Sequence, residues 1–370
     1  MPFRRTTILL AQGLLLLAGL HVEAAGAKSL AAVEGSVPVP VVQDGRFEVA
    51  TAAGRGEIPI PVSRDWTVPQ PDIERAVIVI HGWQRSDLGA GEAAAAAAKA
   101  GLDASTLVVT PQFLIQPDID AHALPARTLR WSLSGWKSGA DATGPAPISS
   151  FAVLEAIVAR LADRRLFPHL STVVVAGHSA GGQFVQRYAV LGGADRLARQ
   201  GVHVRYVVAN PSSYLYFDAS RPRPAVAGAC PRLDRWPYGF DGAHPAFLDS
   251  SLDVATAEKH YAALDLIYLL GTADNDPAHH QLDRSCAGEA EGATRIERGL
   301  AYAATMRARD GERTAQRVFE VPGVGHHSAR MLASACGVAA LFDRGECAEI
   351  PGPVSTATAV RPPPAASEPQ

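Results

Sequence analysis

The chain has 370 residues, of which 47% are hydrophobic and 19% are charged, and its formal net charge is -3. This composition is that of a folded protein with ample apolar material for a core. The near-neutral charge and the lack of a basic cluster give no electrostatic basis for nucleic-acid binding, so we expect no nucleic-acid partner.

The N-terminal segment is typical of an export signal. Arg4 and Arg5 precede an apolar stretch, residues 7–20, which is too short for a comfortable membrane span. Ala25-Gly26-Ala27 then forms a small-x-small cleavage site. We therefore expect residues 1–27 to be a signal peptide and the mature protein to be secreted or periplasmic, with an uncleaved anchor as the alternative. No second apolar run is long enough for a stable membrane span.

Strand-like and helix-like segments alternate along most of the remaining chain. Two proline-broken segments, 37–49 and 58–62, are typical of edge strands or extended arms. Continuous apolar runs predict buried strands at 75–80, 106–110, 172–175, 202–209, 264–270 and 316–321. Helices are expected at 92–100, 151–166 (capped by Ser149-Ser150), 183–191, 291–309 and 328–342. This alternation predicts an α/β fold with a mostly parallel central sheet and helices on both faces.

Two long segments lack this rhythm. Residues 211 to about 262 contain Pro, Gly, Tyr and Trp but no strand pattern, and such long insertions usually cover a site. The tail, 351–370, consists mostly of Pro, Ala, Ser and Thr, so we expect it to be disordered. The folded part is then one domain over residues 28–350.

The most informative motif is Gly177-His178-Ser179-Ala180-Gly181, which follows a buried-type strand and precedes a helix. Strand, G-x-S-x-G and helix together predict a nucleophile elbow. The turn must be so sharp that its serine is strained and exposed, which requires flanking positions that are nearly free of side chains. The helix N-terminus also directs free N–H groups at an anion near the serine. A plain turn built of small residues is the alternative.

Four polar residues, His81, Ser179, Asp274 and His326, each come just after a predicted strand. In parallel sheets the catalytic loops lie at the carboxyl ends of the strands. We therefore expect these four side chains to converge on one edge of the sheet, although nearly 250 residues separate the first from the last.

The order Ser179, Asp274, His326 resembles that of the α/β-hydrolase fold family. The markers are Gly-His-Ser-Ala-Gly, Gly-Thr-Ala-Asp and Val-Gly-His, and His81-Gly82 is similar to the family's oxyanion loop. The resemblance covers about residues 70–345. It implies the α/β-hydrolase fold, with the 211–262 stretch as a loop-rich cap insertion.

The resemblance also implies a role for each residue. His326 would take the proton of Ser179 and pass it to the leaving group, and Asp274 would hold the imidazole in the required tautomer. The backbone N–H groups of Trp83 and Ala180 would stabilise the oxyanion.

Two assignments have close neighbours as alternatives. Asp276 could replace Asp274, but Gly-x-x-Asp is the family's usual spacing. His327 could replace His326, but His326 directly follows a glycine. We favour Asp274 and His326.

Other residues are expected to support the site. Gly82, Gly177 and Gly181 would permit tight turns, His81 would orient the oxyanion loop, and His178 would pack or hydrogen-bond behind the elbow. His279-His280 could suggest a metal, but without further ligands we favour a solvated loop and expect no metal and no cofactor. Substrate-pocket candidates, for which ordinary packing is an equal alternative, are Trp131, Trp136, Tyr214 and Tyr216.

An even number of cysteines in an exported chain predicts two disulfides. The four cysteines allow three pairings. Cys336 and Cys347 are close in sequence and bracket a turn-rich segment, so we favour this pair together with Cys230–Cys286.

These features predict an exported serine hydrolase that cleaves a small-molecule or acyl-ester substrate, most simply a carboxylic ester. A secreted peptidase or a polyester depolymerase of the same fold is an alternative, as is a non-catalytic binding protein that retains the fold. The choice of esters over amides is an analogy with common members of the family.

Overall fold

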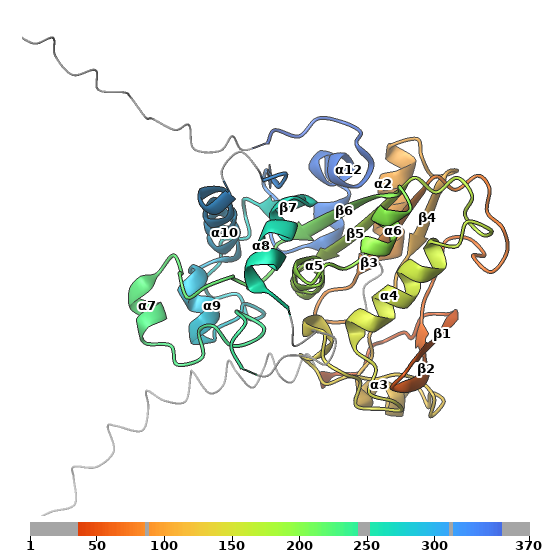
Figure 1. Ribbon diagram of the computed structural model, residues 1–370, viewed down its shortest axis with the longest axis horizontal. Coiled ribbons are helices and arrows are strands. Elements are labelled where there is room, and N and C mark those ends of the chain that lie inside the picture. Colours follow the sequence, from red (N-terminus) through yellow and green to blue (C-terminus); the bar gives the residue numbers. More distant parts are fainter. Residues whose placement is uncertain (1–35, 86–88, 243–251, 311–313, 350–370) are drawn as a thin grey trace, which may run out of the picture.

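The computed structural model describes residues 36–85, 89–242, 252–310 and 314–349. Its centre is a six-stranded sheet in the order β4-β3-β5-β6-β7-β8, in which every neighbouring pair is parallel (Figure 1). The strands are β3 (Arg75–Ile80), β4 (Thr106–Val109), β5 (Thr172–His178), β6 (His203–Ala209), β7 (Asp265–Gly271) and β8 (Arg317–Val321). The expected parallel sheet is therefore confirmed.

The strands are apolar throughout because both faces of the sheet are covered. In β3, Ala76, Ile78 and Ile80 join one hydrophobic cluster, whereas Val77 and Val79 join the other. Successive side chains of a strand point to opposite faces, so a run without alternation supplies two cores at once.

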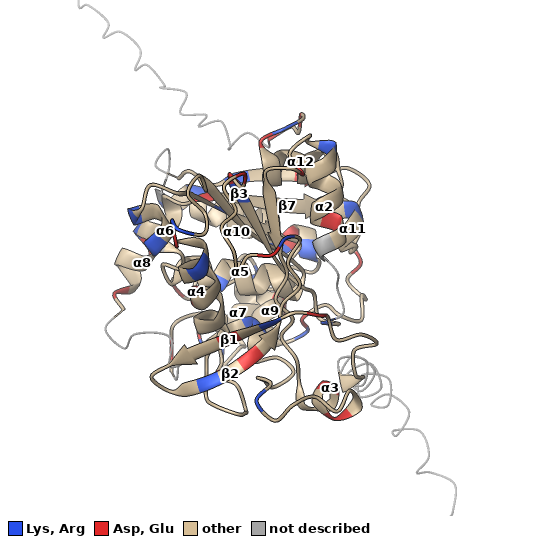
Figure 2. Ribbon diagram, turned by 90° about the vertical axis from the view of Figure 1, so that its right-hand side faces the viewer, with Lys and Arg blue, Asp and Glu red and all other residues tan. Residues whose placement is uncertain are grey.

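Helices cover both faces of the sheet (Figure 1). Apolar side chains of three helices pack into the smaller cluster: α2 (Gly89–Lys99), α11 (Ser328–Leu332) and α12 (Ala335–Phe342). Five others contribute to the larger cluster: α4 (Ser150–Leu161), α5 (Ala180–Val190), α6 (Asp195–Arg199), α8 (Val254–Ala262) and α10 (Arg295–Asp310). The side of the molecule seen in Figure 2 carries both acidic and basic segments, in keeping with a net charge near zero.

Shorter elements complete the described chain. They are the antiparallel pair β1 (Arg46–Thr51) and β2 (Gly54–Pro59), α3 (Gln116–Ala121), the 3-10 helix η1 (Trp136–Ser138), α7 (Pro224–Gly228) and α9 (Cys286–Glu291). Helices α7 and α8 lie within the expected 211–262 insertion. Both predicted disulfide pairings are present: Cys230–Cys286 joins the insertion to α9, and Cys336–Cys347 closes a loop after α12.

All five expected helices have different bounds in the structure, and a local cause or end point can be given for three of them. The expected 328–342 helix is divided into α11 and α12 because the Ser334 hydroxyl accepts a hydrogen bond from Gly337 N (2.9 Å) and so caps a new helix. The expected 291–309 helix begins only at Arg295, since Gly292 has a φ of 153° and ends α9. Ser149 caps α4 as predicted, but this helix ends at Leu161 rather than at residue 166.

The expected signal peptide, 1–27, and the expected disordered tail, 351–370, lie outside the described residues. The single domain over 28–350 remains a prediction. Among the helices of the described ranges, none is long and apolar enough to cross a membrane.

Candidate active site

Ser179 occupies the tight turn between β5 and α5. Its φ is 59°, a conformation that costs a non-glycine residue energy, and its N–H donates to Ala209 O at 2.9 Å. A Cβ atom at Gly177 would lie 2.3 Å from the Gly181 carbonyl oxygen, and one at Gly181 would lie 2.2 Å from the Ile80 carbonyl oxygen. Both positions therefore require glycine because backbones approach closely there.

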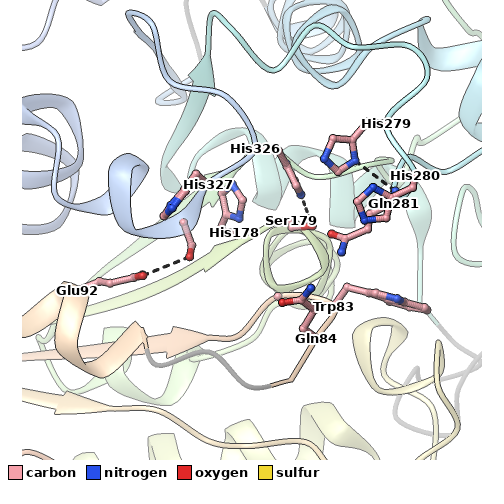
Figure 3. A pocket seen from close by; sticks show the side chains of 12 residues that line it. Trp83, Gln84, Glu92, His178, Ser179, His279, His280, Gln281, His326 and His327 are labelled. Carbon is pink, nitrogen blue, oxygen red and sulfur yellow. Dashed lines mark hydrogen bonds between the residues drawn. The ribbon is translucent and has the colours of Figure 1, made fainter. Parts of the chain in front are cut away.

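Three polar side chains from the ends of three strands form one hydrogen-bonded chain. His326, after β8, places Nε2 2.9 Å from the Ser179 hydroxyl (Figure 3). Its Nδ1 lies 2.7 Å from Oδ2 of Asp274, which follows β7. The His326 and Asp274 side chains are only 7% and 3% exposed. Because parallel strands end at one edge, this convergence follows from the sheet order.

Arg295, which the sequence analysis did not single out, holds the other oxygen of Asp274. Its Nη1 lies 3.2 Å from Asp274 Oδ1, and its Nε donates to the Ser212 hydroxyl at 3.1 Å. The Arg295 side chain is buried and also reaches the His279 ring at 3.4 Å. Both carboxylate oxygens of Asp274 are thus bound by different partners, which fixes its orientation.

The surroundings set the ionisation of this chain. Burial by itself would raise the pKa of Asp274, but the hydrogen bond and charge of His326 and the charge of Arg295 outweigh it, so the pKa is lowered and the carboxylate stays ionised. Burial lowers the pKa of His326; the hydrogen bond to Asp274 opposes this change and the Arg295 charge adds to it. A neutral imidazole with Nδ1–H facing Asp274 leaves Nε2 free to accept from Ser179.

The two alternatives raised from the sequence lie elsewhere. Asp276 is exposed, and its carboxylate accepts from the Ala278 N–H at 2.8 Å in a local turn. His327 is exposed at the start of α11, where its ring accepts from Arg330 N at 3.5 Å. The structure thus brings Asp274 and His326, rather than these neighbours, into the chain that reaches Ser179.

The loop after β3 lies against the elbow. His81 Nδ1 donates to Gly82 O at 2.8 Å, and its Nε2 accepts from Phe113 N at 2.9 Å. Burial lowers the pKa of His81 to about 4, so the ring is neutral and can make both bonds. A Cβ atom at Gly82 would lie 4.0 Å from that of Ser179, which shows how closely the loop approaches.

In the described part of the chain, two backbone N–H groups near Ser179 donate no hydrogen bond. Ala180 opens α5, so its N–H has no partner within the helix. Neither this group nor the N–H of Trp83 donates a hydrogen bond within the described ranges of the chain.

His178 is buried behind the elbow, with its ring 4.6 Å from that of His326, and burial lowers its pKa well below the ordinary value.

Two cavities meet at Ser179. The larger, about 470 Å³, extends between His326 and Trp83 toward Glu92 and His279 (Figure 3). The smaller, about 240 Å³, shares Ser179 and Trp83 with it and extends toward Lys137. A substrate could therefore place groups on both sides of the serine.

The expected aromatic pocket differs from what the structure shows. At most 1% of each of four side chains is exposed, and all four belong to the larger core cluster: Trp131, Trp136, Tyr214 and Tyr216. Their rings pack on other aromatics, as Tyr214 does by stacking on Tyr302 at 4.5 Å and Trp136 on Phe113 at 5.8 Å. They line neither cavity at Ser179, whereas Trp83 lines both.

His279 and His280 stack with ring centroids 4.8 Å apart, and His279 also packs edge-on against His326. Burial lowers the pKa of His279 to about 4, with the Arg295 charge adding to this effect. In the described ranges, no group of three His, Cys, Asp or Glu side chains is arranged to hold a metal ion.

Comparison with known proteins adds to this geometry. No protein-family model matches the sequence, and no curated protein matches it. Among solved structures, the chain is similar to poly(aspartic acid) hydrolase-1 from Sphingomonas sp. KT-1, with 24% identity over 80% of this chain and 96% of the other, and a TM-score of 0.53. It is also similar to a poly(3-hydroxybutyrate) depolymerase from Bordetella parapertussis, with 19% identity over 85% of this chain and 96% of the other, and a TM-score of 0.56. The sheet order, the covering helices and these similarities together show that the chain has the α/β-hydrolase fold.

Proposed function

We propose that this protein is a serine hydrolase that cleaves carboxylic esters through an acyl-enzyme on Ser179. The observation that carries the proposal is the chain in which His326 lies 2.9 Å from Ser179 Oγ and 2.7 Å from Asp274 Oδ2. A serine hydroxyl is a poor nucleophile at neutral pH unless a base lies within hydrogen-bond reach.

In this mechanism Ser179 Oγ attacks the ester carbonyl while its proton passes to His326 Nε2. The oxyanion of the tetrahedral intermediate accepts from the free N–H groups of Trp83 and Ala180. When the intermediate collapses, the bond to the alcohol breaks and His326 gives the alcohol its proton. Water then attacks the acyl-enzyme by the same route and releases the acid. Asp274 keeps the imidazole in the required tautomer and stabilises the imidazolium.

Fluorophosphonate labelling tests the nucleophile. The wild type should acquire one label on Ser179, located by mass spectrometry, and Ser179→Ala should acquire none. Labelling of both proteins to the same extent would reject Ser179, and absence of labelling in the wild type would favour a binding protein that retains the fold.

A polymer is the second candidate substrate. The cavities on both sides of Ser179 could accommodate a chain that continues past the scissile bond. Both structural neighbours described above are named for hydrolysis of polymers, one a polyester and one a polyamide. Release of soluble products from poly(3-hydroxybutyrate) and poly(aspartic acid), compared with p-nitrophenyl esters and peptide anilides, would distinguish polymer, ester and peptide hydrolysis.

We also propose that the protein is exported. Two disulfides are consistent with an oxidising compartment outside the cytosol. The N-terminal sequence of the protein recovered from the secreted or periplasmic fraction should begin near Lys28; recovery of the full chain from the membrane fraction would instead indicate an uncleaved anchor.

A further inference from the structure

The smaller cavity beside Ser179 contains a charged group that the proposed mechanism does not use. This cavity of about 240 Å³ is lined by Ser179 and Ala180 at one end and by Lys137 and Asp283 among its polar side chains. Pockets for drug-sized ligands are usually about 300–1,000 Å³, so this one suits a short substituent. What it binds must be compatible with an ammonium group near the reacting serine.

Lys137 is held on a rigid segment. It lies in η1, whose neighbouring Trp136 is fully buried and whose end is marked by Gly139 with a φ of 76°. The Lys137 carbonyl accepts a hydrogen bond from Arg187 at 3.2 Å. The backbone of Lys137 is therefore held in place on both sides.

The Lys137 ammonium interacts with the charge of Asp283 at a distance but pairs directly with no carboxylate of the described residues. Its Nζ lies 5.0 Å from the centroid of the Trp83 ring, but it makes no hydrogen bond or ion pair with any residue that the structure describes. Burial lowers the pKa of Lys137 to about 8, although the Asp283 carboxylate opposes this change. A cation that has lost much of its hydration and has gained no hydrogen-bond acceptor is unfavourable, unless a ligand supplies that acceptor.

The nearby carboxylate is already bound by other groups. Asp283 accepts from the Tyr238 hydroxyl at 2.6 Å and from Ser285 N at 2.9 Å. Among the residues that the structure describes, the buried guanidinium of Arg187 donates to two backbone carbonyls and a serine hydroxyl, and none of these partners is a carboxylate. The charges that act on Lys137 are the negative charge of Asp283 and the positive charges of Arg187 and Arg295.

We propose that Lys137 binds a carboxylate on the acyl part of the substrate, so that the preferred substrates are esters of acids carrying a second, negatively charged carboxyl group a few bonds from the scissile carbonyl. The proposal rests on the hydrolase function proposed above. The carboxylate would supply the hydrogen-bond acceptor that the Lys137 ammonium lacks. Trp83, beneath the ammonium, would help to orient it toward the cavity.

Hydrolysis of two matched esters tests this inference. The p-nitrophenyl monoester of adipic acid and p-nitrophenyl hexanoate have acyl chains of equal length but differ in the terminal carboxylate. The wild type should show a higher kcat/KM for the adipate ester. Lys137→Met should lower the ratio of the two kcat/KM values by about 10- to 100-fold, the effect expected for loss of a charged hydrogen bond. Lys259→Met, at an exposed lysine of α8, is the matched control and should leave the ratio unchanged.

A binding measurement separates this subsite from the hydrolase proposal. In the Ser179→Ala background, calorimetry should show that monomethyl adipate, which keeps one free carboxylate, binds more tightly than methyl hexanoate, which has none, and Lys137→Met should weaken monomethyl adipate binding at least tenfold. Equal binding of these two methyl esters, or an unchanged ratio of the p-nitrophenyl ester kcat/KM values in Lys137→Met, would overturn the subsite. If no ester were cleaved and no fluorophosphonate label formed, but Lys137-dependent binding of monomethyl adipate persisted, the hydrolase function would fail while the subsite stood.

Discussion

Replacing Asp274 with asparagine should move the imidazole proton of His326 from Nδ1 to Nε2, because Arg295 would fix the orientation of the new amide. Asp274 accepts from Arg295 with one oxygen and from His326 Nδ1–H with the other. An asparagine side chain has one acceptor oxygen, and a guanidinium can only donate, so the amide oxygen must face Arg295. The amide NH₂ then faces Nδ1, which becomes an acceptor, and the imidazole proton moves to Nε2. His326 can then no longer accept the proton of Ser179.

The expected loss is large and partly reversible. A wrong imidazole tautomer in a serine protease triad lowers kcat by about 10⁴-fold, or about 5.5 kcal/mol of transition-state stabilisation. Turning the amide back would break its hydrogen bond to Arg295, which is worth about 1.5–3 kcal/mol for a charged donor. Removing Arg295 as well should therefore restore part of the activity. We expect the Asp274→Asn/Arg295→Met double variant to be about 10- to 100-fold faster than Asp274→Asn.

The assay is kcat/KM for a p-nitrophenyl ester in the wild type, both single variants and the double variant, with thermal unfolding to verify that each protein is folded. Arg295→Met alone should cost about tenfold, because one hydrogen bond to Asp274 is lost. Asp276→Asn is the matched control and should change kcat/KM less than about threefold, since that carboxylate is exposed. A folded double variant no faster than Asp274→Asn would refute the reasoning.

Three further outcomes follow from the structure. His326→Ala should lower kcat/KM by at least about 10³-fold, whereas His327→Ala, at an exposed cap, should change it less than about threefold; similar losses would reject the assignment. Because burial lowers the pKa of His326 and the base must be neutral, activity should fall as pH drops through that pKa, which places the acid limb of the kcat/KM profile below pH 6.5; a limb above this value would contradict the burial argument. Replacing Cys230 and Cys286 with serine should lower the free energy of unfolding by about 4 kcal/mol, since their disulfide closes a loop of 56 residues; urea unfolding measures this, and a change below about 1 kcal/mol would contradict the loop-entropy estimate.

The elbow could be predicted from the sequence because its causes are local. Close approach of backbones demands glycine at 177 and 181, and this demand leaves a pattern within five residues. Asp274 and His326 could be placed because each follows a buried strand, and parallel strands end at one edge. The paired alternatives, Asp276 and His327, differed from them only in exposure, which depends on the packed loops.

Arg295 and Lys137 could not be predicted in the same way. Arg295 is the first residue of α10 and lies 21 residues after Asp274 in the sequence. Their contact therefore depends on how the chain folds back after β7. Lys137 reaches the cavity from η1, in a segment without strand or helix periodicity. The aromatic composition of the irregular segments suggested that Trp136 and Tyr214 line a pocket. Large apolar rings are stabilised most by full burial, however, and both side chains lie in the core.

Substitutions at the strand ends and in the irregular segments should have different effects on activity. In the proposed mechanism the residues at the strand ends hold the reacting atoms, so changes to Ser179 or His326 should slow every substrate by a similar factor. The irregular segments that carry Lys137 and Asp283 meet those atoms only at the cavity wall, so changes there should alter the ratio between substrates. The parallel sheet would thus determine that a bond is cleaved, and these irregular segments would determine which ester is presented to the serine.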